Sequence, residues 1–191
     1  MKNVLIIVGH PDKESFNFGL ADTYQESAVK AGARVERINI RDLDFNPNLG
    51  YGYRKRTNLE PDLLAAIEQI KQAGHIVWFF PMWWFGSPAI MKGFIDRTFL
   101  PGIAFAYTDS PFPQRLFKGK TGRIVVTADT PRWYDRWVMG KPALNQLKKG
   151  TLEFSGIKPV RVTYISPIKD SKADFREKWL ERMRRLGRKL G

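Results

Sequence analysis

The sequence contains no cysteine and only two histidines, His10 and His75. The missing thiols exclude disulfides and a thiolate nucleophile, and so few histidines argue against zinc, so we expect no metal site. No apolar run approaches the roughly 20 residues that a membrane helix needs. The opening MKNVLIIVGHP has no small-residue cleavage site and predicts a first strand, not a signal peptide. We therefore expect a soluble, cytoplasmic protein.

Two nucleotide-binding motifs are also missing. The sequence has neither Gly-x-Gly-x-x-Gly nor a Walker lysine motif, which excludes a Rossmann dinucleotide loop and a P-loop. Repeats and low-complexity segments are absent too. A length of 191 residues with 43% hydrophobic residues suits one domain with a sizeable core. We predict a single domain over residues 1–191.

Positive charge is in excess, with a formal net charge of +13. Such a charge favours anionic partners: nucleic acid, a membrane surface or phosphorylated ligands. Many of the basic residues lie in 169–189, mixed with acidic residues and with apolar ones at helical spacing, among them Phe175, Trp179 and Met183. We interpret this segment as an amphipathic helix with a solvated basic face. We expect no nucleic-acid partner and no membrane insertion, and leave open peripheral contact with an anionic surface.

Strand and helix patterns alternate along the chain. Strands are predicted at 4–8, 34–40, 75–80, 122–127 and 160–165, and helices at 16–31, 61–73, 88–99, 142–154 and 172–190. Ser15 or Asn17 could cap the first helix. The segments 41–58 and 128–141 are predicted as long loops. This alternation predicts an α/β, flavodoxin-like fold: a five-stranded parallel sheet in the order 2-1-3-4-5 with helices on both faces.

In such sheets a ligand binds beyond the carboxyl ends of the strands, where the strand order reverses. The loops that meet there are 9–17, 81–87 and 128–141, which are also the most unusual segments of the sequence. Fold and composition therefore indicate the same place for the functional site.

The first of these loops joins the first strand to the first helix. A helix N-terminus offers free backbone N–H groups and a partial positive charge to an anion. Ser15 and Asn17 add donors, and His10 could donate to a phosphate oxygen. The loop by itself favours phosphate binding only slightly over an ordinary capped helix.

The second loop carries three consecutive aromatic residues, Trp83, Trp84 and Phe85, at the end of a buried strand. Leaving them in water is costly, and successive side chains point opposite ways, so the core cannot take all three. We expect a flat ligand to cover part of this cluster, with packing beneath the next helix as the alternative.

The third loop combines aromatic and charged residues. Arg132, Arg136 and Lys141 could meet the phosphates of a nicotinamide nucleotide, and Trp133 and Tyr134 could wall a pocket for a planar substrate. A structured surface loop or a dimer contact explains the arginines equally well.

These motifs together resemble the family of NAD(P)H:quinone oxidoreductases with a flavodoxin-like fold. The resemblance runs from Val4 to about Tyr134 and rests on five segments. They are His10 with Ser15-Phe16-Asn17, Leu43-Asp44-Phe45-Asn46-Pro47, Pro81-Met82-Trp83-Trp84-Phe85-Gly86, Pro88-Ala89-Ile90-Met91-Lys92-Gly93 and Phe105-Ala106-Tyr107.

The chain also departs from that family. Thr127-Ala128-Asp129-Thr130 stands where the family often has Thr-Thr-Gly-Gly. Tyr134 falls where members carry a tyrosine that relays charge during hydride transfer, while the histidine that partners it has no counterpart; the matching position is near Lys141.

The resemblance implies a flavoenzyme that transfers hydride from NADPH or NADH to a quinone-like acceptor by a ping-pong reaction. It implies Tyr134 as the catalytic residue and a set of flavin-binding residues. These are His10, Ser15, Phe16, Asn17, Pro81, Met82, Trp83, Trp84, Phe85, Gly86, Thr127 and Asp129. Size favours FMN, whereas the Ser15-Phe16-Asn17 match resembles FAD-binding members.

The resemblance further implies a homodimer. Two other functions stay open: an ancillary flavin-binding subunit of an ion-efflux system, and a flavodoxin-like electron carrier. The basic charge and the aromatic third loop argue against the carrier.

Overall fold

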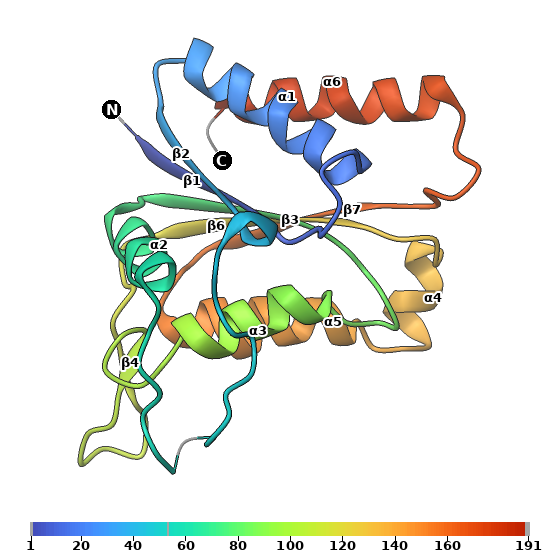
Figure 1. The fold of residues 1–191 in the computed structure, drawn as a ribbon. Helices are drawn as coiled ribbons and strands as arrows, with labels where there is room; N and C mark the ends of the chain where they lie inside the picture. The colour runs from blue at the N-terminus through green and yellow to red at the C-terminus, as the bar shows by residue number, and fades with distance from the viewer. Residues whose placement is uncertain (1, 53, 190–191) are drawn as a thin grey trace.

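The computed structural model describes residues 2–52 and 54–189. Its centre is a five-stranded parallel sheet in the order β2-β1-β3-β6-β7 (Figure 1), which confirms the predicted flavodoxin-like α/β fold. The strands are β1 (Asn3–Val8), β2 (Arg34–Asn39), β3 (His75–Pro81), β6 (Thr121–Thr127) and β7 (Val160–Ile165).

Helices cover both faces of the sheet. Helices α1 (Phe16–Lys30) and α6 (Ala173–Lys189) lie on one face, and α2 (Pro61–Gln72) and α3 (Ala89–Thr98) on the other, with α5 (Pro142–Leu144) and η2 (Asn145–Glu153) (Figure 1). Successive side chains of a strand point to opposite faces, so β1 supplies both cores. Val4, Ile6 and Val8 pack under α1 and α6, and Leu5 and Ile7 pack on the other side.

The predicted strands and helices agree with the structure to within one or two residues, apart from three differences described below. Helix α1 begins at Phe16 with Ser15 as its N-cap, so Asn17 lies inside the helix and is not its cap. Leu190, the predicted end of the last helix, lies outside the described residues. Among the described helices, none is long and apolar enough to cross a bilayer.

The first difference is in the segment 128–141, which was predicted as a loop. It contains the short helix α4 (Arg132–Trp137) after Pro131. Trp133 and Trp137 are exposed, so the helix has no continuous apolar stripe and leaves no helical periodicity in the sequence.

The second difference is the predicted helix 142–154. Its first three residues and Phe154 are α-helical, and η2 (Asn145–Glu153) between them is a π-helix. The Thr151 hydroxyl bonds the carbonyl oxygen of Gln146, five residues earlier. Because π and α turns differ by one residue, they leave nearly the same apolar pattern.

The third difference is a small antiparallel hairpin that was not predicted, formed by β4 (Phe105–Ala106) and β5 (Gln114–Arg115). Two-residue strands are too short to show an alternating pattern. The long loop after β2 is largely irregular as predicted, after the 3-10 turn η1 (Ile40–Asp42).

Arg97 of α3 anchors that long loop. Its side chain is 1% exposed and donates to the backbone oxygens of Asn46 and Asn58, and it forms an ion pair of 2.7 Å with Glu60. The guanidinium thus satisfies backbone groups that the loop itself leaves unpaired.

Candidate functional site

The three loops expected to meet at the carboxyl edge of the sheet do meet there, around an open cavity of about 350 Å³. Its lining comprises His10, Asp12, Ser15, Phe16, Asn17, Pro81, Met82, Trp83, Thr127, Ala128, Asp129, Ile168, Lys169 and Arg176. Nine of the predicted site residues are among them. We call this space the edge cavity.

His10 is held in one tautomer. The backbone N–H of Asp12 donates to its Nδ1 at 2.9 Å, so the neutral ring carries its proton on Nε2, where it can be donated to a ligand. Burial lowers the pKa of His10, opposed by Asp12. The ring also stands edge-on to Trp83 with centroids 5.6 Å apart, which joins the first loop to the second.

Ser15 and Asn17 bring buried polar atoms without partners to the cavity. Ser15 makes no side-chain capping bond, and its Oγ is buried and unpaired. Asn17 donates from Nδ2 to the Thr127 hydroxyl at 2.8 Å, while its Oδ1 is buried and unpaired. Unpaired buried polar atoms cost free energy. A ligand that carries a phosphate and hydroxyl groups would satisfy both atoms, so these residues fit a flavin nucleotide.

The aromatic loop turns tightly. Trp83 and Gly86 exchange two backbone hydrogen bonds of 3.0 and 2.8 Å, and the two residues between them have positive φ, +48° at Trp84 and +56° at Phe85. Positive φ at both central positions is typical of a type I′ turn, which favours glycine and asparagine. Bulky residues there are strained, and such strain clusters at functional sites. Trp84 is fully exposed at the tip.

Asp129 ties the loop after β7 to the edge cavity. One of its carboxylate oxygens accepts the backbone N–H groups of Ile168 (3.2 Å) and Lys169 (2.6 Å). Arg176 of α6 reaches the same place, with its guanidinium 5.7 Å from the centre of the Phe16 ring. Asp129 therefore holds the loop after β7 in position along this wall of the cavity.

Ile168, Lys169 and Arg176 also line the edge cavity, and they are not among the residues predicted from the sequence. Lys169 and Arg176 were counted with the solvated basic segment, because helical periodicity does not distinguish one cation of a charged face from another. Their position after β7 could have indicated them, because the carboxyl end of β7 lies at the same edge of the sheet as the three loops.

Four predicted site residues do not line the edge cavity. Trp84, Phe85 and Gly86 lie beyond Trp83 in the same turn, and Tyr134 lies on α4 with 37% of its surface exposed. All four residues follow strands that end at the same edge of the sheet, but they are not part of the cavity lining.

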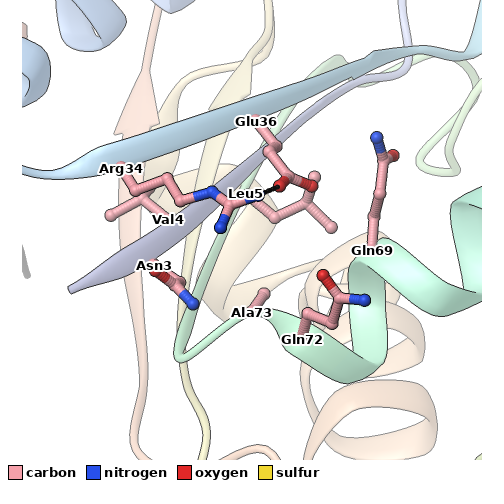
Figure 2. A pocket seen from close by; sticks show the side chains of 8 residues that line it. All are labelled: Asn3, Val4, Leu5, Arg34, Glu36, Gln69, Gln72 and Ala73. Carbon is pink, nitrogen blue, oxygen red and sulfur yellow. Dashed lines mark hydrogen bonds and ion pairs between the residues drawn. The ribbon is translucent and has the colours of Figure 1, made fainter. Parts of the chain in front are cut away.

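A crevice at the opposite, amino edge of the sheet is far smaller. Figure 2 shows its lining, in which Arg34 and Glu36 form an ion pair of 3.1 Å beside Gln69 and Gln72. A volume of about 10 Å³ has room for about one water. This crevice does not compete with the edge cavity as a ligand site.

Comparisons with known proteins agree with this geometry. The family described as flavodoxin-like fold matches residues 2–186. NAD(P)H dehydrogenase [quinone] 1 of Rattus norvegicus is 26% identical over 208 residues, covering 95% of this chain and 74% of its own. Ribosyldihydronicotinamide dehydrogenase [quinone] of Mus musculus is 30% identical over 185 residues, covering 82% and 78%.

Solved structures are similar over nearly the whole chain. Smu.1420 from Streptococcus mutans UA159 has a TM-score of 0.85 and 28% identity, with 98% of this chain and 99% of that chain covered. An FMN-dependent NADH-azoreductase from Bacillus anthracis, solved with FMN, has a TM-score of 0.77 and 18% identity, with 99% of each chain covered, and shows the fold alone. The chain therefore belongs to the NAD(P)H:quinone oxidoreductase family, and it is an oxidoreductase.

Proposed function

We propose that the protein is a flavin-dependent NAD(P)H oxidoreductase that reduces quinones or similar planar acceptors. One observation carries the proposal: the edge cavity places the buried, unpaired Ser15 Oγ and Asn17 Oδ1 at the open N-terminus of α1. A cavity that already holds such atoms at a helix N-terminus suits a phosphorylated, hydroxyl-rich ligand.

In this proposal the first loop binds the flavin phosphate. His10 donates from Nε2, Ser15 donates from its hydroxyl, and the N–H groups of Phe16 and Asn17 lie in the first turn of α1, where no helical acceptor exists. Asn17 Oδ1 accepts from a hydroxyl of the ribityl chain. Thr127 matters because its hydroxyl orients the Asn17 amide.

The second loop is assigned to the ring. The peptide groups of Trp84 and Phe85 at the tip of the turn are left over by the Trp83–Gly86 pairing, so they can meet the polar edge of the isoalloxazine. Fixed N–H donors there would stabilise, without rearrangement, the negative charge that a bound flavin carries at that edge when reduced. In this proposal the Trp84 and Phe85 side chains would flank the ring, and Tyr134 of α4 would lie over it as the catalytic residue.

When bound, the flavin supplies the hydride-accepting and hydride-donating chemistry. The chain's part is to anchor, orient and shield it. NADPH or NADH and the acceptor occupy the same pocket in turn, which gives ping-pong kinetics. We propose FMN as the flavin. FAD is the alternative, and Lys169 and Arg176 support it as two additional cations at the rim that could bind a second phosphate.

We also propose a homodimer. Large apolar side chains are exposed on α4 and on the aromatic turn: Trp84, Trp133, Trp137 and Val138. Several exposed large apolar side chains are typical of an interaction site, and a second subunit that covers them would exclude water from the ring.

The test is the absorbance spectrum of the purified protein, identification of any released chromophore, and anaerobic addition of NADPH. We expect flavin bands that bleach on addition. Asn17→Glu should abolish flavin retention, because it places a buried carboxylate against the phosphate. Gln114→Glu makes a similar change at an exposed position of β5 and should retain flavin.

A protein that cannot be reconstituted with FMN or FAD would refute the proposed flavin-dependent function. Bound flavin with negligible NAD(P)H turnover would instead indicate the ancillary subunit or the electron carrier. Normal flavin content in Asn17→Glu would show that the first loop does not bind the flavin phosphate, while the proposed flavin-dependent function would still hold.

A further inference from the structure

A second cavity, of about 200 Å³, lies between α4, η2 and β7, and the flavin site proposed above does not use it. Its lining consists of Arg132, Asp135, Arg136, Lys141, Leu144, Asn145, Lys148, Lys149, Val162 and Tyr164. Five of these side chains are basic and one is acidic. We call this space the basic cavity.

The basic side chains are largely uncompensated. Among the described residues, Lys148 has an ion-pair partner, Glu153 at 3.8 Å, whereas Arg132, Lys141 and Lys149 have no carboxylate within ion-pair distance. Converging cations in a concave site repel one another and attract an anion. Because these cations come from two separate elements and the turn between them, tertiary structure alone assembles them.

The backbone that assembles this cluster is itself unusual. Gly140 and Lys141 both have positive φ, +71° and +58°, and the Asn145 side chain donates to the Gly140 oxygen to hold this turn. The π-helix η2 follows directly. Left-handed non-glycine residues and π-helical turns are both enriched at functional sites.

The one carboxylate restricts the class of ligand. Asp135 is 1% exposed, one of its oxygens is buried without a partner, and burial raises its pKa while Lys141 opposes the shift. Beside it, the Tyr164 hydroxyl donates to the Thr130 oxygen at 3.0 Å. A carboxylate among the cations disfavours a chain of phosphates, whose several negative charges it would repel. A single phosphate next to a sugar hydroxyl places its charge on the cations and offers a donor to the carboxylate.

The two cavities are linked through one short segment. Thr127, Ala128 and Asp129 line the edge cavity, and Arg132 lines the basic cavity three residues later. The two linings are thus close along the chain on either side of Pro131, which is what a ligand that reacts at the edge cavity and extends past α4 requires.

We propose that the basic cavity binds the 2′-phosphate of NADPH and makes the enzyme prefer NADPH to NADH. The 2′-phosphate is a phosphomonoester beside the ribose 3′-hydroxyl, which is the chemistry that the cations and Asp135 together fit. The proposal rests on the proposed function for its role in turnover, but not for the binding itself.

The test uses Arg132→Gln with Lys149→Gln, because both side chains are exposed and unpaired and their loss leaves the core intact. For the wild type we expect a higher kcat/KM with NADPH than with NADH. The double variant should lose about tenfold in kcat/KM for NADPH, mainly through KM, with little change for NADH. Arg185→Gln removes a charge from the exposed side of α6 and should leave the NADPH to NADH ratio unchanged.

A direct binding measurement separates this proposal from the proposed function. Calorimetry with adenosine 2′,5′-bisphosphate, adenosine 5′-monophosphate and inorganic phosphate needs no turnover. We expect the bisphosphate to bind the wild type at least tenfold more tightly than the double variant, and the monophosphate to bind both alike. Equal binding of the bisphosphate by both proteins, an equal NADPH to NADH preference, or inorganic phosphate bound as tightly as the bisphosphate would overturn the proposal.

Discussion

From the strain in the aromatic turn we predict that one substitution there stabilises the flavin-free protein and weakens its flavin binding. Trp84 has φ +48° and is fully exposed, so its side chain makes no packing contribution that offsets its strain. Asparagine tolerates the left-handed region because its short side chain hydrogen-bonds locally. Trp84→Asn should therefore relieve strain without opening a cavity.

The magnitude follows from the geometry. A non-glycine residue held at positive φ costs on the order of 1–3 kcal/mol, and asparagine recovers part of this. We expect a gain of about 1 kcal/mol in the free energy of unfolding, which raises the Tm of a domain of this size by about 2–4 °C. The same change removes one aromatic flank of the proposed ring site, worth about 1 kcal/mol, or about a fivefold loss of flavin affinity.

The assay is thermal unfolding of flavin-free protein, together with flavin titration followed by fluorescence. Flavin-free protein is needed because bound ligand raises Tm by mass action. Phe112→Asn is the control, since Phe112 is 80% exposed and lacks positive φ; it should change neither quantity. A Trp84→Asn variant with lower apo stability would refute the strain argument, and unchanged flavin affinity would remove Trp84 from the ring site.

Three further predictions concern the scaffold. Burial lowers the pKa of His75 to about 4. The unfolded chain therefore binds a proton at a higher pH than the folded protein does, and the free energy of unfolding should fall by about 3 kcal/mol as the pH drops from about 6.5 to 4. Urea titrations of His75→Asn should show a weaker pH dependence. Arg97→Met removes the ion-pair partner of Glu60 and the donor to the backbone oxygens of Asn46 and Asn58, and should cost about 1–3 kcal/mol in chemical denaturation. A neutral result would show that the ion pair is dispensable. Gly93→Ala would place a Cβ 2.4 Å from the Pro47 Cβ and 2.7 Å from the Pro47 oxygen. This overpacking should lower the free energy of unfolding by about 1–3 kcal/mol in chemical denaturation. An unchanged denaturation midpoint would mean that the loop containing Pro47 moves aside.

Much of the candidate site was predictable because strand order and loop position follow from local patterns. Once the alternation of strands and helices set a parallel sheet, the loops bearing His10, Asn17 and Trp83 had to meet at its carboxyl edge. Lys169 and Arg176 were missed because their role depends on where the segment after β7 lies and not on any local signal.

The irregular elements were the other limit. A short helix with exposed aromatic side chains, α4, lacks the one-sided pattern by which helices are recognised. A π-helix differs from an α-helix in which carbonyl each N–H bonds, and side-chain spacing hardly registers that difference. Both elements line the basic cavity, so the sequence could name Arg132, Arg136 and Lys141 as cations but not show that they converge with Lys148 and Lys149.

The sequence by itself determined the fold, the edge of the sheet at which the edge cavity lies and most of the residues that line this cavity. These follow from hydrophobic periodicity, from turn residues and from the direction of parallel strands, all of which are local. Only the tertiary structure decided which polar atoms are buried without partners, where the strain of the aromatic turn falls, and how the cations of α4, of the turn after it and of η2 form one cavity. Those properties are sums over neighbours that the fold brings together, so no local window of the sequence contains them.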